Sequence, residues 1–558
     1  MMLPGIPRAS NPKTGVQTAF GGLNRNPGAR DGALLACRDL TSDYYPVLAS
    51  RGKRWKIAEQ TDWYGNSMID WDGLVWMDLR TIYYRGAAIA TLPEGAGGFS
   101  GAHAVGMGKY LYIWPNNWVC NLDTGDLSPV QVQATAAAHS APGFNVTFQN
   151  GTLNGETAAM NTVAAVDTTF DFADFFRPGD AVKFQSGGAL TKNAGTHIIR
   201  EIEGNVMRFN ENTFKEAGTA FYIIGRSAPV FDWMCENGNR LWGASNEDNT
   251  IYACKLGDPF NWYVYDGLAS DSYAVAVGSK GDFTGCISYL GHPMFFKENH
   301  IYKMYGNKPS NYELQDHMTL GVMKGNGKSL AIAGETLFYN SRKGIMAYTG
   351  SAPRSIQEPL GVENIGSESK PIVAGSDGLK YYAAAKGNGL YIYDTRRGMW
   401  LQDGDWSEYG VHGADAFALS AGLLYMKDNV GQVWCYCRES EAPTHIGYDP
   451  ASGMAELGDY YNYNNSSGSG TNRKYVTRLL LRLECQNAMT VKIMYDSSGT
   501  WQNAATIPAM TKNSRVCSVP INRCDHYRIR LESSGEWKLF SIAEDYVTGS
   551  GSNATVTV

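Results

Sequence analysis

Short apolar runs separated by glycine- or asparagine-rich turns recur along most of the chain from about residue 55 onwards. Each unit pairs one apolar segment with a second, rich in Ile, Leu, Val and Tyr, in which apolar and polar positions alternate. Alternation with a period of two is typical of a half-buried strand, and a turn of a few residues between two such runs indicates a β-hairpin. Seven hairpins can be traced, at residues 73–86, 108–122, 239–256, 292–306, 335–350, 379–394 and 422–437.

The hairpins follow one another at a nearly constant spacing. The second strands of the last five begin at Ile251, Ile301, Ile345, Leu390 and Val433, so successive starts lie 50, 44, 45 and 43 residues apart. A strand-built repeat of about 40–50 residues is the spacing of propeller blades, each of which is a four-stranded sheet. We therefore predict an all-β protein with a β-propeller of about seven blades. The count is fixed to within one blade, because ring closure often splits a blade between the chain ends.

The segments outside the repeat predict additional domains. Prolines and glycines crowd the first 50 residues and exclude a regular helix or long strand there. The second and third hairpins are separated by far more than one blade, and alternating runs after residue 474 are typical of a β-sandwich. The predicted organisation is an extended N-terminal arm (1–54), the first part of the propeller (55–124), an inserted small β-barrel or sandwich domain (125–228), the remaining blades (229–440), a loop or linker (441–473) and a C-terminal β-sandwich (474–558).

Composition supports this architecture and excludes some functions. Only 18% of the 558 residues are charged, whereas 63 are glycine and 33 are tyrosine, a mix that favours short strands and tight turns. A net charge of −6 argues against dedicated nucleic-acid binding, which normally needs a basic surface. The sequence contains no long apolar run and its start lacks an apolar signal core, so we expect no membrane-spanning segment and no export. The ten dispersed cysteines are expected to be free, buried thiols.

Motifs that carry chemistry are few. The sequence holds no HExxH zinc motif, no paired CxxC and no GxSxG elbow. Cys435 and Cys437 lie two apart on a predicted strand and therefore on one face, where metal or redox use is less expected than packing. The glycine-rich run VGMGKY (105–110) is expected to be a blade turn. The run GNGKS (325–329) precedes a predicted strand, LAIAG, where a phosphate loop would require a helix.

Carboxylates and aromatic side chains are the remaining candidates for a site. A glycoside hydrolase needs two carboxylates beside the sugar bond, but the sequence alone brings no two of Asp232, Asp258, Asp266 and Asp394 together. The nearest approach to a sialidase Asp-box is YDSSGTW (495–501), which lacks the leading serine and has altered spacing. The aromatic clusters WPNNW (114–118), DPFNWYVYD (258–266) and GDYYNYNN (458–465) could stack on sugars, although packing is the simpler interpretation. We predict no catalytic, cofactor-binding or metal-binding residues and no enzymatic activity.

Several stretches together resemble structural proteins encoded among the virion genes of tailed bacteriophages of Firmicutes-type hosts. The opening segment resembles theirs, three stretches of the repeat are similar to their propeller, two resemble their inserted β-domain, and the last resembles their C-terminal end. These stretches are TAFGGLNRNPGARDGALLACRDLTSDYYPVLASRGKR (18–54), LGDPFNWYVYDG (256–267), GDFTGCISYLGHPMFFKENHIYKMYGNKPS (281–310), LFYNSRKGIMAYTGSAP (337–353), DFFRPGDAVKFQSGG, HIIREIEGNVMRFNENTF (197–214) and INRCDHYRIRLESSGEWKLFSIAEDYVTGS (521–550). A more distant likeness, in architecture, is to the tail nozzle or tail hub proteins of short-tailed phages.

The resemblance implies a structural role in the virion. Such a protein forms a homo-oligomeric ring, expected to be hexameric, below the portal and its adaptor, where it continues the DNA exit channel and helps retain and eject the genome. Viral DNA would pass without specific binding, and the protein would be made in the bacterial host cytoplasm. The family brings no catalytic set, cofactor or metal. The alternatives are a receptor-binding tail protein that recognises surface glycans, a tail-associated glycan hydrolase, or a structural protein at the tail tip or neck.

Overall fold

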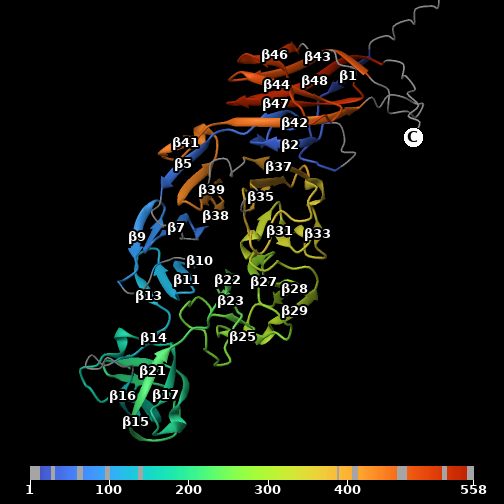
Figure 1. The fold of residues 1–558 in the computed structure, drawn as a ribbon. Coiled ribbons are helices and arrows are strands. Elements are labelled where there is room, and N and C mark those ends of the chain that lie inside the picture. The colour runs from blue at the N-terminus through green and yellow to red at the C-terminus, as the bar shows by residue number, and fades with distance from the viewer. Residues whose placement is uncertain are drawn as a thin grey trace, which may run out of the picture. The chain divides into compact units, whose positions relative to one another are not determined.

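The computed structural model describes residues 13–26, 32–59, 67–94, 98, 101–135, 143–385, 389–404, 413–461, 474–517 and 524–548. Their regular structure consists of strands β1 to β48 and six single-turn 3-10 helices (Figure 1). The short turns are η1 (Phe172–Asp174), η2 (Thr191–Asn193), η3 (Pro309–Asn311), η4 (Gly327–Ser329), η5 (Glu358–Leu360) and η6 (Glu439–Glu441). In the described residues no helix is long and apolar enough to cross a membrane. The chain divides into two compact units, residues 1–63 with 331–558 and residues 64–330.

The unit of residues 64–330 contains four antiparallel sheets of four strands, which we number as blades 1 to 4 in chain order. Blade 1 is β6 (Met68–Asp70), β7 (Leu74–Asp78), β8 (Thr81–Tyr84) and β9 (Ala87–Thr91). Blade 2 is β10 (His103–Met107), β11 (Tyr110–Trp114), β12 (Trp118–Asn121) and β13 (Leu127–Pro129). Blade 3 is β22 (Trp233–Glu236), β23 (Leu241–Ser245), β24 (Thr250–Ala253) and β25 (Tyr273–Ala276). Blade 4 is β26 (Gly285–Tyr289), β27 (His292–Lys297), β28 (His300–Tyr305) and β29 (Glu313–Met318).

Within this unit the first strand of each blade contacts the first strand of the next, in the order β6, β10, β22 and β26. Large side chains of one blade fill the space that glycines of its neighbour leave open. The indole of Trp71 rests against Gly106 of β10 so closely that a Cβ there would lie 2.0 Å from the ring. Successive first strands side by side are the arrangement of propeller blades.

An inserted domain lies between blades 2 and 3. It is a single curled eight-stranded sheet in the order β18-β17-β21-β15-β16-β20-β19, with β14 paired to β21 (Figure 1). Its strands are β14 (Val132–Gln133), β15 (Phe144–Leu153), β16 (Glu156–Ala165), β17 (Ala181–Ser186), β18 (Gly195–Ile198), β19 (Glu201–Glu203), β20 (Val206–Arg208) and β21 (Gly218–Arg226). A separate core rich in phenylalanine, which includes Phe148, Phe184 and Phe214 in edge-to-face contact, fills the curled sheet.

The other unit contains three further sheets, blades 5 to 7. Blade 5 is β30 (Ala331–Ala333), β31 (Thr336–Ser341), β32 (Gly344–Tyr348) and β33 (Arg354–Ser355). Blade 6 is β34 (Ile372–Ser376), β35 (Lys380–Ala385), β36 (Gly389–Asp394) and β37 (Met399–Asp403). Blade 7 is β38 (Ala414–Ser420), β39 (Leu423–Asp428), β40 (Gln432–Tyr436) and β5 (Arg54–Glu59), with β41 (Gly447–Asp449) as a fifth strand on β5. The first strands β30, β34 and β38 again contact one another in order.

Blade 7 takes strands from both ends of the chain, because β5 pairs with β40 in antiparallel register. This is the split blade that ring closure commonly produces. With its seven blades, the fold class predicted from the hairpin repeat is confirmed: an all-β protein built as a β-propeller with an inserted β-domain and a C-terminal sandwich.

The C-terminal sandwich consists of two antiparallel sheets. One has the order β3-β4-β48-β43-β46 with β1 paired to β48, and the other has the order β2-β42-β47-β44-β45. Their strands are β1 (Lys13–Gln17), β2 (Leu34–Arg38), β3 (Leu40–Thr41), β4 (Leu48–Ser50), β42 (Ser452–Tyr461), β43 (Lys474–Cys485), β44 (Met489–Tyr495), β45 (Gln502–Ile507), β46 (Met510–Cys517), β47 (His526–Ser534) and β48 (Trp537–Thr548). The core between them includes Leu481, Ile529 and Leu539, which are fully buried.

The structure differs from the sequence prediction in two segments. Within 1–54, for which we expected an extended arm, β1 to β4 are strands of the sandwich, and Leu34, Leu40 and Leu48 are buried in its core. Within 441–473, for which we expected a loop or linker, β42 is a ten-residue strand paired to β47. In both cases the segments gain their strand structure from pairing within the sandwich, where β1 and β4 pair with β48 and β42 pairs with β2 and β47, and not from local preference. Residues 462–473 of the predicted linker and the C-terminal tail 549–558 lie outside the described residues.

Candidate functional site

A cleft of about 860 Å³ opens within the unit of residues 1–63 and 331–558. Its walls come from the N-terminal segment, blade 6, blade 7 and the C-terminal sandwich, represented by Arg51, Lys380, Tyr436 and Trp537. The cleft therefore lies where the sandwich meets the propeller blades of its own unit.

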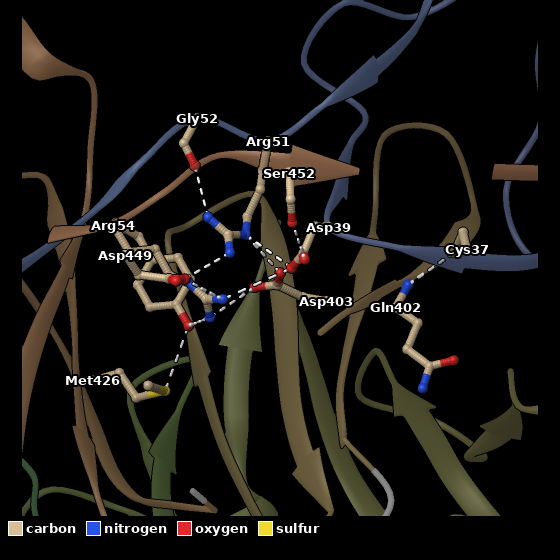
Figure 2. A network of polar contacts seen from close by, with 11 residues as sticks. Cys37, Asp39, Arg51, Gly52, Arg54, Gln402, Asp403, Met426, Asp449 and Ser452 are labelled. Atoms are coloured by element: carbon tan, nitrogen blue, oxygen red, sulfur yellow. Dashed lines mark hydrogen bonds and ion pairs between the residues drawn. The ribbon is translucent and has the colours of Figure 1, made fainter. Parts of the chain in front are cut away.

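Arg51 joins three parts of the chain at this cleft. Its Nε donates to Oδ1 of Asp39 over 3.0 Å and to Oδ1 of Asp403 over 2.9 Å, while Nη2 donates to Oδ2 of Asp449 over 2.7 Å. Figure 2 shows the guanidinium group between these carboxylates. Asp39 follows β2, Asp403 ends β37 of blade 6 and Asp449 ends β41. One side chain thus ties the N-terminal segment to blade 6 and to the entry into the sandwich.

Arg54 makes a second set of bonds to the same acids. Its Nε donates to Asp449 over 3.0 Å, and its Nη1 donates to Asp403 over 3.3 Å and to the Tyr436 hydroxyl over 3.1 Å (Figure 2). The carboxylates raise the pKa of Arg54 against the opposing effect of burial. Two guanidinium groups therefore hold three carboxyl groups in a network that is mostly shielded from water.

Asp39 and Asp403 form a hydrogen-bonded carboxyl pair. Their side chains are 7% and 1% exposed. Burial raises the pKa of Asp403 to about 7, because Arg54 and Arg51 offset the loss of water only in part and Asp39 adds a like charge. Burial also acts on Asp39, but the hydrogen bond with Asp403 and the two guanidinium groups lower the pKa of Asp39 well below its usual value. In this pair Asp39 therefore ionises first, and Asp403 keeps its proton to a higher pH.

The rim of the cleft is also internally paired. Lys380 contacts Asp43 at 2.6 Å, Lys53 contacts Glu439 at 3.4 Å and Lys538 contacts Glu484 at 3.2 Å. These charges offset one another, so the cleft has no single sign of charge to select an ionic ligand. Buried pairs with several hydrogen bonds fix geometry more than they add stability. The arrangement is suited to holding the sandwich on blades 6 and 7.

The four aspartates considered in the sequence analysis each have separate partners. The Asp232 carboxylate accepts the Asn246 N–H over 2.7 Å, and Asp258 accepts the Asn261 side-chain amide over 2.7 Å. Asp266 pairs with Arg200 at 2.8 Å, and Asp394 is buried and accepts the Ser42 hydroxyl over 2.6 Å. Each carboxylate thus has a role in positioning the chain around it.

The aromatic clusters are largely buried. Trp114 of the first cluster and Phe260 and Trp262 of the second lie in the core shared by blades 2 and 3. Tyr265 is exposed. In the third cluster, Tyr460 stacks on Tyr527 with ring centroids 5.4 Å apart, and residues 462–465 lie outside the described residues. Packing accounts for the first two clusters, as expected.

The cysteines of the described residues carry free thiols, most of them buried. Cys435 and Cys437 lie on one face as expected, with their sulfur atoms 3.4 Å apart. Burial raises the pKa of Cys37 and Cys254 to about 12, which keeps these thiols protonated and unreactive. The group of described residues that could hold a metal ion lies elsewhere, at Asp496, Asp525 and His526 in the sandwich.

Sequence reasoning missed the whole Arg51–Arg54 network. The segment ASRGKR contains two arginines and three small residues, but nothing in it identifies their partners. Asp39 lies 12 residues before Arg51, whereas Asp403 and Asp449 lie 352 and 398 residues after it. The backbone of Asp39 is in the left-handed region, with φ of 56°. A single sequence does not reveal this conformation, so it gave no local signal for the network.

Comparison with known proteins gives a likeness in fold only. No protein-family model matches, and no curated protein matches. Among solved structures, BamB from Moraxella catarrhalis is 10% identical, covers 70% of this chain and 99% of its own, and has a TM-score of 0.37. YCF48 from Cyanidioschyzon merolae is 8% identical, covers 70% and 97%, and has a TM-score of 0.32. These likenesses concern the β-propeller fold and say nothing about function.

Proposed function

We propose that this protein is a structural component of a bacteriophage tail, forming a nozzle or hub ring that continues the DNA channel below the portal and its adaptor. The observation that carries the proposal is the Arg51–Arg54 network, in which the N-terminal segment, blade 6 and the sandwich are held by shared, buried ion pairs. A side-chain arrangement of this kind favours a fixed shape over ligand turnover.

A part that retains pressurised DNA has to resist forces on its chain ends. Here the N-terminal segment is paired within sheets at several points: β1 and β4 pair with β48, β2 pairs with β42, and β5 pairs with β40. Pulling on the N-terminal segment would shear several ladders together instead of peeling one strand. The propeller also leaves few exposed strand edges, so copies can assemble through chosen surfaces without open-ended sheet growth.

The inserted domain supplies a second, separate body for contacts with neighbours. It is anchored to the loop after β24 of blade 3 through Asn261, whose amide Nδ2 donates to Asp180 over 2.9 Å and whose Oδ1 accepts the Ala181 N–H over 2.9 Å. Arg200 pairs with Asp266 across the same boundary at 2.8 Å. A β-domain held firmly on a blade can serve as a docking module between ring subunits or toward the adaptor.

The resemblance of the seven sequence stretches to tailed-phage virion proteins supports a location in the virion tail. A net charge of −6 is compatible with a channel through which DNA moves without adhering, because repulsion of phosphates prevents tight binding. Homo-oligomeric assembly, expected to be hexameric, and synthesis in the host cytoplasm belong to the same proposal.

The test is the position of the protein on virions. Antibodies raised against the full chain and labelled with gold are applied to intact particles, with pre-immune antibodies as the control, and the particles are imaged in negative stain. Label on the tail axis next to the head supports the nozzle or hub. Label on peripheral fibres or spikes contradicts it and favours a glycan-recognising adhesin, and particles without label contradict a virion role.

A further inference from the structure

The motif YDSSGTW, which fails as an Asp-box, forms a tight turn at the end of β44 in the C-terminal sandwich. The Ser498 N–H donates to the Tyr495 carbonyl over 3.0 Å, and the two residues between them, Asp496 and Ser497, have φ of 48° and 51°. Such a turn favours glycine or asparagine at its centre, so a serine there is held against its own preference. Conformational strain of this kind is concentrated at functional positions.

This turn is fastened to the start of β47, which pairs with β44 in the same sheet. The Asp496 N–H donates to the His526 carbonyl over 3.2 Å, and the Asp525 N–H donates to the Asp496 carboxylate over 2.9 Å. Backbone bonds in both directions therefore fix the turn relative to the pair Asp525–His526.

The side chains at this junction form a hydrogen-bonded relay. Ser497 Oγ lies 2.7 Å from His526 Nε2, and His526 Nδ1 lies 2.5 Å from Asp525 Oδ1. These are a nucleophile within hydrogen-bonding distance of a base, and a base oriented by a carboxylate. The imidazole is largely covered, with 12% of its side chain exposed, whereas Ser497 is exposed.

The contacts fix the direction of the relay. The Asp525 carboxylate can only accept, so the 2.5 Å contact with His526 Nδ1 places the proton of a neutral imidazole on Nδ1. This leaves the Nε2 lone pair to accept the Ser497 hydroxyl over 2.7 Å. This polarity is the one that a serine nucleophile needs.

We propose that Ser497, His526 and Asp525 form a nucleophilic site that hydrolyses carboxylic esters at the surface of the sandwich. Ser497 Oγ bonds to the ester carbonyl carbon while its proton moves to His526 Nε2. The carbonyl–alkoxy bond then breaks, and His526 returns that proton to the departing alcohol. Water, deprotonated by His526, attacks the acyl-serine, and the acid is released as Ser497 regains its proton. In the described residues the N–H groups of Ser497 and Gly499 make no hydrogen bond, so they remain free for the carbonyl oxygen.

A divalent cation is the competing use of the same side chains. Ligand atoms of Asp496, Asp525 and His526 all lie within 4.8 Å of one another. Both imidazole nitrogens, however, already have partners in Ser497 and Asp525, and the two carboxyl groups bond to each other. A metal ion would have to break the relay, so the two uses exclude each other and can be separated by a chelator.

The experiment uses the purified full chain and does not depend on a role in the virion. A fluorophosphonate probe labels activated serines, and peptide mapping locates the adduct, while p-nitrophenyl acetate reports ester hydrolysis. Ser497→Gly removes the hydroxyl but suits the positive φ, so it should fold, and Ser498→Gly in the same turn is the matched control. Asp525→Asn and His526→Gln test the relay separately, and thermal unfolding of every variant verifies folding.

We expect one adduct per chain at Ser497, absent in Ser497→Gly and retained in Ser498→Gly. Ester hydrolysis should fall about 100-fold or more in Ser497→Gly and in His526→Gln, the range that a positioned general base supplies. An adduct at another residue or none, or equal hydrolysis by wild type and Ser497→Gly, overturns the proposal. Hydrolysis abolished by EDTA and restored by a divalent cation also overturns it, in favour of a metal site.

Discussion

Nε of Arg51 donates a hydrogen bond to Oδ1 of Asp403 over 2.9 Å, although the two residues are 352 positions apart in the chain. Arg51 lies just after the last N-terminal strand of the sandwich, and Asp403 ends the last strand of blade 6. The bond therefore joins the sandwich to blade 6. Because the side chains of Arg51 and Asp403 are only 11% and 1% exposed, the contribution of this bond depends on the whole set of charges around it.

The raised pKa of Asp403 predicts a dependence of stability on pH. Since burial raises the pKa of Asp403 to about 7, the folded protein holds a proton that the unfolded chain loses near pH 4. The free energy of unfolding should therefore decrease as pH rises from about 4 to 7, by at most about 1.4 kcal/mol per pH unit for one proton, and then level off. Thermal unfolding measured at pH 5, 6, 7 and 8 checks this, with exchange protection of β37 as a local readout.

The variant Asp403→Asn tests whether Asp403 is the group whose titration changes the stability. An asparagine amide can donate to Asp39 as the protonated carboxyl does, but it does not titrate, so the decrease in stability between pH 5 and 7 should become smaller. Asp449→Asn, at the more exposed acid of the network, is the control and should keep the wild-type slope. Equal slopes in wild type and Asp403→Asn would show that the proton is not held there.

Loss of one guanidinium group should be far more costly than loss of a surface charge. Arg54→Met leaves Asp403 and Asp449 with one buried cation fewer, and breaking a buried pair in this way costs about 3–5 kcal/mol. Lys53→Met removes the neighbouring charge, whose partner Glu439 is exposed, and should cost at most about 1 kcal/mol. Denaturant unfolding of the two variants, followed by tryptophan fluorescence, makes the comparison. Similar losses would mean that the network is not strongly coupled.

Removal of residues 1–50 should open the C-terminal sandwich. The truncation deletes β1 to β4 and takes Leu34, Leu40 and Leu48 out of the core, where each buried leucine contributes about 1.5–3 kcal/mol. It also leaves the edges of β42 and β48 unpaired, which promotes aggregation. Hydrogen–deuterium exchange of β42 and β48 should rise and light scattering should increase. Unchanged protection of these strands after the truncation would contradict this role for the segment.

Asn261 should control how firmly the inserted domain is held. Its side chain is almost fully buried at 1% exposure and bonds to Asp180, Asp258 and the Ala181 N–H. Asn261→Leu leaves these groups unsatisfied, at a cost of about 1–3 kcal/mol for each buried group. Limited proteolysis should then cut the connections of the domain sooner than in wild type. Asn145→Leu, at an exposed position of β15, is the control, and equal cleavage rates would contradict the prediction.

The parts of the fold that could be predicted from the sequence are the repeated hairpins and the strands in which apolar and polar residues alternate. The hairpin period indicated the propeller and its number of blades, and strands β43, β44, β47 and β48 follow alternating runs that are visible without a structure. Strands β1 to β4 and β42 were not predicted, because their own residues do not reveal the strands that stabilise them: β1 and β4 pair with β48, β2 pairs with β42, and β42 also pairs with β47.

The sites were less predictable than the fold for the same reason. Arg51, Arg54, Asp39 and Asp403 carry no motif, and only the folded chain brings them together. The aspartate and glycine of YDSSGTW suggested an Asp-box, and not the relay that the structure shows. The residue that completes the relay, His526, comes from another strand and gives no signal beside Asp525 in the sequence.

The pairing of β5 with β40 and of β1 and β4 with β48 has a consequence for synthesis. Translation delivers the N-terminal strands first, but their partners leave the ribosome only when nearly the whole message has been read. A nascent chain must keep these early strands unpaired for most of that time, and a product interrupted before β48 leaves β1 and β4 without their partner. The fold thereby makes completion of the polypeptide a condition for its mature shape, and truncated products are left recognisable to chaperones and proteases before they can enter an assembly.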